Sequence, residues 1–247
     1  MRPFAQAQAL VSCGDTVTTG PWIHADAPAP IALRMAQYFV IHPGNPQHRL
    51  IRRSAEIVRR GGVIVYPTDS CYALGCRLGD KAAQERIRNI RRLEARRHFT
   101  LVCRDLSQIS HYARLDNHVY RMLKATTPGS YTFILRATRE VPRRLQDAKR
   151  NTIGLRVPGH RVVQELLTEL DEPLLSSTLL LPGDELPLND AGEIRARLKH
   201  QVDLVLDGGS CGIEMTTVVD LTAEVPEIVR MGKGSLEPFG IAARVHA

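Results

Sequence analysis

Gly61-Gly-Val-Ile-Val-Tyr-Pro-Thr-Asp-Ser-Cys-Tyr-Ala-Leu-Gly75 joins a short apolar run to a polar turn. The run 63–66 is continuous and is bounded by glycine and proline, which is typical of a strand buried on both faces. The turn places the hydroxyls of Thr68 and Ser70 and the ring of Tyr72 just beyond that strand, where polar side chains can hold a small ligand. By itself, the turn is equally compatible with a purely structural role.

Helical and strand patterns alternate on both sides of this stretch. We expect helices near residues 46–60, 80–92, 105–112, 116–125, 160–170 and 190–200. We expect strands near 38–41, 63–66, 99–103, 131–136, 152–157, 174–178, 202–206, 216–221 and 227–230, with another between Cys71 and Cys76. The pattern predicts an α/β domain built on a large twisted sheet. Several successive strands lack an intervening helix, so we expect the sheet to be mixed rather than wholly parallel.

The composition is that of a globular protein of one large domain or two small ones. The chain has 247 residues, of which 43% are hydrophobic and 24% charged. No apolar run approaches the roughly 20 residues of a membrane helix. The five cysteines are scattered and odd in number, unlike a secreted disulfide framework. These features exclude collagen, coiled coil and disulfide scaffold, and they favour a cytoplasmic protein.

The first 34 residues differ from the rest of the chain. They are rich in Ala, Pro, Thr and Gly, and the run 26–30 predicts a stiff, extended linker. They lack the continuous apolar stretch of a signal peptide. We expect residues 1–34 to be a disordered extension or the product of a misassigned start, with Met35 as the biological start. The folded domain is then 35–247.

The chain is basic, with 33 Lys and Arg against 26 Asp and Glu and a net charge of +7. Residues 1–34 contain two arginines and two aspartates, so the whole excess lies in residues 35–247. Such a balance favours nucleic acid or nucleotide phosphates as partners. Improved solubility alone is the alternative explanation.

Arginines are concentrated in the segment 86–97. Ile87 and Ile90 fit the buried stripe of a helix, which leaves six arginines facing solvent or in the following loop: Arg86, Arg88, Arg91, Arg92, Arg96 and Arg97. Only Glu85 and Glu94 lie nearby in sequence, so we favour RNA phosphate recognition over a merely solvated helix face. A second basic group, 143–144 with 149–150, could extend the same surface.

Three other motifs carry no chemistry in this interpretation. The segment 208–212 matches G-x-S-x-G, but a strand is predicted to follow it, so we expect a Gly-rich hairpin instead of a nucleophile elbow. The segment 231–234 lacks the glycine spacing of a phosphate-binding loop. Cys71 and Cys76 have the wrong spacing for paired zinc ligands, so we predict buried free thiols and no metal site.

Six motifs in chain order resemble those of the YrdC/YciO-like family, the threonylcarbamoyl-adenylate synthase superfamily. They lie at 67–75, 128–132, 153–158, 175–178, 216–220 and 229–232, and the resemblance covers essentially residues 35–240. It implies a twisted, open, mixed sheet flanked by helices, with a positively charged concave face. In detail the chain is most similar to the YciO subgroup.

The resemblance also implies a reaction and its partners. Synthases of this family convert L-threonine, bicarbonate and ATP, with magnesium, into threonylcarbamoyl-adenylate and pyrophosphate, for modification of an adenosine in tRNA. ATP and magnesium act there as co-substrates, and no tightly bound cofactor is implied. Such a reaction depends mainly on alignment of the reactants and on cations that neutralise the phosphates. The implied macromolecular partner is tRNA or double-stranded RNA.

Residue by residue, the resemblance implies two groups of binding positions and no identifiable catalytic residue. The substrate-binding positions are Thr68, Tyr72, Thr178 and Thr217. The nucleotide-binding positions are Arg91, Arg156 and Arg230.

Two positions depart from the family pattern. Leu93 stands where a Lys-x-Arg pair has its second cation, and Leu180 stands where Ser-x-Asn has its amide. Loss of one charge-assisted contact costs roughly 1.5–3 kcal/mol, so both together could lower the rate about a thousandfold or more. Arg96 or Arg97 could replace the missing cation. Three functions therefore stay open: weak threonylcarbamoyl-adenylate synthesis, hydrolysis of a threonylcarbamoyl group on tRNA or adenylate, and non-enzymatic RNA binding.

Overall fold

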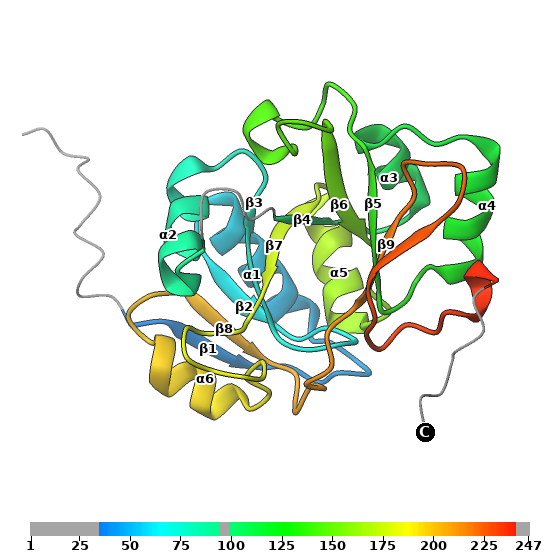
Figure 1. Ribbon diagram of the computed structural model, residues 1–247. Coiled ribbons are helices and arrows are strands. Elements are labelled where there is room, and N and C mark those ends of the chain that lie inside the picture. The colour runs from blue at the N-terminus through cyan, green and yellow to red at the C-terminus, as the bar shows by residue number, and fades with distance from the viewer. Residues whose placement is uncertain (1–34, 94–98, 241–247) are drawn as a thin grey trace, which may run out of the picture. The chain divides into compact units, whose positions relative to one another are not determined.

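Short and largely apolar strands, most of them buried on both faces, form a ten-stranded sheet (Figure 1). The computed structural model describes residues 35–93 and 99–240. The strands are β1 (Gln37–Val40), β2 (Ile64–Tyr66), β3 (Ala73–Arg77), β4 (Thr100–Val102), β5 (Tyr131–Arg136), β6 (Thr152–Arg156), β7 (Leu174–Thr178), β8 (Leu204–Asp207), β9 (Thr217–Asp220) and β10 (Glu227–Arg230). Their order in the sheet is β1-β8-β2-β3-β7-β4-β6-β5-β9-β10.

The sheet is mixed, as the sequence predicts. β8 pairs in parallel with β1 and β2, β4 with β6, and β5 with β9. The remaining five pairs are antiparallel, including β5 with β6 and β9 with β10. Both of these hairpin pairs join strands that have no α-helix between them in the chain.

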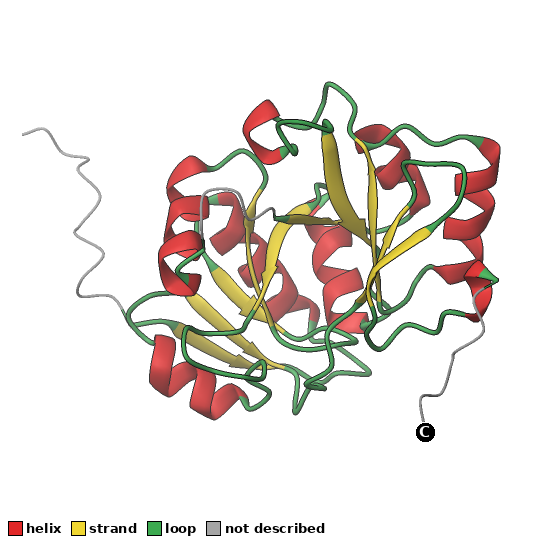
Figure 2. Cartoon of the chain, in the orientation of Figure 1, coloured by secondary structure: helices red, strands yellow, loops and turns green. Residues whose placement is uncertain are grey.

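Six α-helices flank the sheet in the described residues: α1 (His48–Arg59), α2 (Lys81–Arg91), α3 (Leu106–Tyr112), α4 (Asn117–Thr126), α5 (Arg161–Leu170) and α6 (Ala191–Leu198) (Figure 2). Aspartates cap four of them, because a carboxylate accepts hydrogen bonds from the free N–H groups of a first turn. The capping residues are Asp80, Asp105, Asp116 and Asp190. The first helix begins at His48, later than the sequence predicts, with Gln47 before it.

The helices cover the two faces of the sheet differently. Helices α2, α3, α4 and α6 contribute to one large apolar cluster with one face of the strands. On the other face, α1 packs against α5 over a smaller cluster that includes Tyr66, Val102 and Leu174. Next to Val102 and Leu174 on this second face lie the small, polar side chains of Thr100 and Ser176, which are not part of the cluster. The cover by α1 and α5 ends there.

The glycine-rich segment 208–212 is not a hairpin, contrary to the sequence-based expectation. β8 lies between β1 and β2, whereas β9 lies between β5 and β10. The segment therefore belongs to a crossover between distant parts of the sheet. A local pattern of glycines next to a strand does not determine which strands become neighbours.

The described residues contain no helix that is long and apolar enough to cross a membrane. Within the same residues, no group of three or more His, Cys, Asp or Glu side chains is arranged to hold a metal ion.

Candidate functional site

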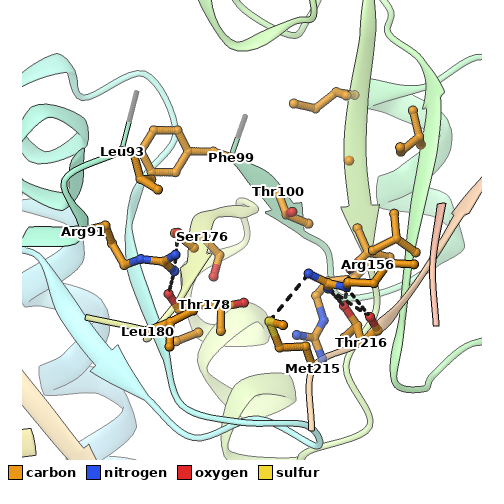
Figure 3. Close-up of a pocket in the computed structure, with 18 of the residues that line it drawn as sticks. Arg91, Leu93, Phe99, Thr100, Arg156, Ser176, Thr178, Leu180, Met215 and Thr216 are labelled. Carbon is orange, nitrogen blue, oxygen red and sulfur yellow. Dashed lines mark hydrogen bonds between the residues drawn. The ribbon is translucent and has the colours of Figure 1, made fainter. Parts of the chain in front are cut away.

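A cavity of about 400 Å³ opens on the sheet face where the cover by α1 and α5 ends (Figure 3). Its floor is a row of four residues in register across neighbouring strands: Ser176, Thr100, Gly154 and Ile134. Three of these side chains are small, which leaves a hollow above the strands. A volume of this size suits a small-molecule ligand.

One wall of the cavity is formed by the end of α2 and the segment after β7. Arg91 reaches across to donate hydrogen bonds to the backbone carbonyl of Thr178 and to Ser177 Oγ. Leu93, Phe99 and Leu180 also line this wall (Figure 3). Leu93 and Leu180 are the two positions that depart from the family pattern. Both line the cavity beside Arg91, and they make this wall largely apolar.

Arg156 stands at the boundary between the cavity and the helix-covered core. Its side chain is 10% exposed and donates to Asp69 Oδ1, forming the pair's salt bridge. Asp69 also accepts hydrogen bonds from Ser130 Oγ at 3.1 Å and from the Gly159 amide at 3.3 Å. The Nε of Arg156 is buried without a hydrogen-bond partner among the described residues. The ion pair with Asp69 therefore fixes the position of the Arg156 guanidinium. Its Nε–H group remains as a donor for a ligand or a water molecule.

The opposite wall is formed by β5, β9 and β10. Arg230 donates to the backbone carbonyl of Thr216 at 2.9 Å, and the Thr132 and Thr216 hydroxyls lie 2.9 Å apart. Burial lowers the pKa of Arg230, because it removes the cation from water. Met215 lies beside the guanidinium, with its sulfur 3.6 Å from Nη1.

Cationic side chains predominate in the lining of the cavity, although Arg156 is paired with Asp69 and Arg150 with Asp220. Four arginines line it, Arg91, Arg150, Arg156 and Arg230, against a single carboxylate, Asp147, within the described lining. Both Asp147 and Arg150 come from the turn before β6. Several guanidiniums around a small hollow can bind the phosphates of a nucleotide through bidentate hydrogen bonds.

The structure brings together four of the seven predicted ligand-binding residues, namely Arg91, Arg156, Thr178 and Arg230. The other three, Thr68, Tyr72 and Thr217, are buried outside the cavity lining. The Thr68 hydroxyl donates to the Cys71 carbonyl at 2.6 Å, and the Tyr72 hydroxyl donates to the Gly209 carbonyl at 2.7 Å. These contacts stabilise the turn 68–71 and its junction with the loop after β8.

Thr217 has a similar local role. Its hydroxyl donates to the Gly234 carbonyl at 2.7 Å and accepts from the Gly232 amide at 3.1 Å. It therefore supports the chain just after Arg230 from outside the cavity lining.

The predicted arginine surface of α2 is less available than the sequence suggests. Arg86 forms a salt bridge of 2.8 Å with Asp203, and only 20% of its side chain is exposed. Arg88 lies over the Phe99 ring at 5.0 Å. Arg91 points into the cavity, whereas Arg92 is exposed at the end of the helix. Arg96 and Arg97 lie outside the described residues, as does the extension 1–34.

The prediction that these arginines mostly face solvent is therefore wrong for Arg86, because its partner is distant in sequence. Conversely, Thr100, Thr132 and Met215 line the cavity but are not among the predicted ligand-binding residues. Thr100 and Thr132 lie on β4 and β5, and the register that brings such strands together is not specified by a single sequence. The carboxylate of Asp69 lies in the polar turn that the sequence offers as a candidate ligand site, and the structure uses it to hold Arg156. The prediction for two cysteines is confirmed: Cys71 and Cys76 are buried free thiols, and Cys103 is another.

Comparison with known proteins shows the family to which the chain is related. Residues 56–232 match the family model named for Sua5, YciO and YrdC and described as telomere recombination. YciO of Escherichia coli is 56% identical over 205 residues, covering 83% of this chain and all of that protein. A threonylcarbamoyl-AMP synthase of Chromobacterium violaceum is 34% identical over 167 residues, covering 67% of this chain and 85% of that protein.

Solved structures share the fold. The crystal structure of E. coli YciO superimposes with a TM-score of 0.80, covering 83% of this chain and all of that one. Sua5 of P. abyssi, solved in complex with L-threonine, gives a TM-score of 0.74 at 23% identity, covering 81% of this chain and 58% of that one.

Proposed function

Because the chain belongs to the Sua5/YciO/YrdC family, we propose that its central cavity binds an adenine nucleotide together with L-threonine and forms threonylcarbamoyl-adenylate. The observation that carries this proposal is the ring of four arginines around a cavity of about 400 Å³ with a small, polar floor. The reaction takes L-threonine, bicarbonate and ATP, with magnesium as part of the nucleotide substrate. Its product would serve tRNA modification, and we place the protein in the cytoplasm with those substrates.

The roles of the cavity residues follow from their positions. Arg91 and Arg230 lie on opposite walls, so each can neutralise one side of a bound polyphosphate. Arg156 is held by Asp69 near the floor, where a fixed cation can stabilise charge on the carbamate or the α-phosphate. The protein thus aligns the reactants and neutralises their negative charge. This role does not require a side chain in the cavity that transfers a proton.

One observation favours a second candidate, hydrolysis of an existing threonylcarbamoyl group on tRNA or adenylate. Leu93 and Leu180 both face the cavity beside Arg91. If this wall binds the triphosphate, their apolar side chains weaken that binding, while the opposite wall keeps its hydrogen-bonding groups. A protein with this asymmetry could act on a preformed threonylcarbamoyl group without needing pyrophosphate as a leaving group.

Mass spectrometry of the products distinguishes the two candidates. The full chain is incubated with L-threonine, bicarbonate, magnesium and ATP, and separately with threonylcarbamoylated tRNA, beside an active synthase as control. The proposal predicts threonylcarbamoyl-adenylate in the first reaction, and its loss in Arg91→Ala. The matched control is Arg92→Gly, which removes the neighbouring exposed arginine at a backbone φ of 46° that glycine tolerates. No adenylate but loss of the group from tRNA would replace the synthase by the hydrolase.

A further inference from the structure

The floor of the central cavity contains a hydroxyl whose proton is already used inside the protein. Ser176 lies on β7, lines the cavity and is 5% exposed (Figure 3). Its hydroxyl donates to the backbone carbonyl of Leu74 at 3.1 Å. Its Oγ also lies 2.6 Å from the hydroxyl oxygen of Tyr66. A serine hydroxyl has a single proton, so Tyr66 is the donor in this second hydrogen bond.

Tyr66 reaches Ser176 across an intervening strand. β3 lies between β2, which carries Tyr66, and β7. Gly75 of β3 is the register partner of Ser176, and a Cβ at Gly75 would lie 2.7 Å from Cε1 of the tyrosine ring. Only a glycine leaves room for the ring at this position. The fold therefore holds the Tyr66 hydroxyl directly against the cavity floor.

The direction of these hydrogen bonds decides what Ser176 offers to a ligand. Burial raises the pKa of Tyr66 to about 12, because a charged phenolate is poorly solvated in the core. The Tyr66 hydroxyl consequently stays protonated near neutral pH and remains a donor. The proton of Ser176 points to Leu74, and one lone pair of its Oγ is taken by Tyr66. The second lone pair is left for the cavity, so Ser176 accepts hydrogen bonds from a ligand.

The walls of the cavity have the opposite polarity. Guanidinium groups only donate hydrogen bonds, so they bind carboxylate and phosphate oxygens. Arg91 and Arg230 stand on opposite walls of the cavity. A ligand between them turns its acceptors toward the walls, which leaves its donor groups for the floor. An amino acid has both kinds of group, a carboxylate that accepts and an ammonium that donates.

We propose that Ser176 is a specificity-determining residue that accepts a hydrogen bond from the nitrogen of the amino-acid substrate, and that Tyr66 is a positioning residue acting through Ser176. This inference rests on the proposed function. The nitrogen of a primary amino acid keeps one N–H after it becomes a carbamate, so the contact can last from substrate to product. A hydrogen bond from a charged ammonium is also stronger than one from a neutral ribose hydroxyl.

The test measures ligand affinities of the full chain by isothermal titration calorimetry. The ligands are L-threonine, ATP and 3-hydroxybutanoate, which is threonine without its amino group. The variants are Ser176→Ala, Tyr66→Phe and the double variant. The control is Tyr38→Phe, which removes a hydroxyl that donates to Asp207 at 2.5 Å on the edge strand β1. Ser176→Ala leaves the buried Tyr66 hydroxyl without its partner, whereas the double variant removes both groups and preserves the fold.

Ser176→Ala should bind L-threonine at least about tenfold more weakly, while its affinities for 3-hydroxybutanoate and ATP match those of the wild type. Tyr66→Phe should weaken threonine binding about threefold, because the Ser176 oxygen loses one of the two bonds that orient it. The double variant should bind threonine as weakly as Ser176→Ala does, since Tyr66 acts only through Ser176. Tyr38→Phe should bind all three ligands as the wild type does.

Two results overturn the inference and leave the proposed function standing: wild-type threonine affinity in both Ser176→Ala and the double variant, or equal losses for threonine and 3-hydroxybutanoate. A further loss in the double variant beyond that of Ser176→Ala removes the positioning role of Tyr66. No threonine binding by the wild type overturns both the inference and the proposed function. Adenylate formation is followed in parallel by mass spectrometry. Threonine bound through Ser176 without any adenylate keeps the inference and contradicts the proposed reaction.

Discussion

At the scale of single residues, the contact that organises the cavity is the ion pair between Asp69 and Arg156. Both side chains are largely buried, with 16% and 10% exposed. Asp69 also accepts hydrogen bonds from the Ser130 hydroxyl, just before β5, and from the Gly159 amide, just after β6. One carboxylate therefore connects the turn after β2 to both of these loops. A buried arginine that loses such a partner stays charged and desolvated.

We therefore predict that Asp69→Ala lowers the free energy of unfolding by about 3 kcal/mol, because it leaves the Arg156 cation uncompensated. Urea denaturation monitored by circular dichroism measures the change. Asp69→Asn keeps an oxygen that accepts hydrogen bonds and should cost less than the alanine variant. A stability for Asp69→Ala equal to that of the wild type would remove the structural role assigned to this pair.

Two leucines at the cavity wall give a gain-of-function prediction. Leu93→Arg with Leu180→Asn should raise the rate of threonylcarbamoyl-adenylate formation at least about tenfold, because each restored polar contact to the nucleotide is worth roughly 1.5–3 kcal/mol. Product is quantified by mass spectrometry. The control, Leu93→Met with Leu180→Met, keeps the wall apolar and should leave the rate unchanged. An equal rate in both double variants would contradict the assignment of this wall to the nucleotide.

The residues of the cavity show which parts of the site could be predicted from the sequence. The resemblance placed Arg91, Arg156 and Arg230, and all three line the cavity. It did not separate them from Thr68, whose hydroxyl is used in its own turn. Whether a hydroxyl faces a ligand or a neighbouring carbonyl depends on the packing around it, which a motif does not contain.

At the scale of elements, the floor of the cavity depends on β6. Gly154 lies between Thr100 and Ile134 in register, and a Cβ at this position would lie 3.3 Å from Thr100 Oγ1 and 3.4 Å from Thr132 Cγ2. An alanine needs only small shifts of these side chains. A valine would extend into the hollow itself.

Gly154→Val should therefore weaken ATP binding by about tenfold or more, while Gly154→Ala binds nearly as the wild type does. Isothermal titration calorimetry gives both affinities. Valine is well suited to a strand, so the far-ultraviolet circular dichroism of the variant should match the wild type. A folded Gly154→Val protein with wild-type affinity would mean that the nucleotide binds elsewhere.

The end of β9 carries a pH-dependent contribution to stability. Burial by itself would raise the pKa of Asp220, but hydrogen bonds from Thr222 and Arg150 outweigh it and hold this pKa below its usual value. A lowered pKa in the folded state means that the contribution is complete above the unfolded-state value near 3.9 and is lost as the pH falls below it.

Asp220→Asn should consequently be less stable than the wild type at pH 7, and the difference should shrink as the pH falls from about 5 to 3. Thermal unfolding at pH 7, 5 and 3 measures it. A difference that stays constant over this range would show that the Asp220 carboxylate does not contribute through its charge.

The elements themselves could largely be predicted from the sequence. Apolar runs and capping aspartates, such as Asp80 before α2, specify helices and strands locally. The neighbours of each strand could not be predicted. The partners of β8 are 64–66 and 37–40, far earlier in the chain, so the segment 208–212 looked like a hairpin when it is a crossover.

At the scale of the whole molecule, arginines gather both in the central cavity and in a second cavity, which shares Arg150 and Thr152 with it. The sequence showed the excess of arginine but not this division, because Arg114 and Arg143 are 29 positions apart in a chain of 247 residues. Folding brings them to one surface and pairs Arg86 with Asp203 elsewhere. The net charge favours partners that carry phosphate groups, whereas the positions of the arginines follow from the fold.

The proposed function requires one cavity to hold both the nucleotide and L-threonine. The most direct measurement is a crystal structure of the full chain with L-threonine and a non-hydrolysable ATP analogue. We expect phosphate oxygens within hydrogen-bond distance of Arg91 or Arg230, and the threonine above the floor formed by Thr100 and Gly154. A nucleotide bound outside this cavity, or an empty cavity at saturating concentrations of both ligands, would contradict the proposed function.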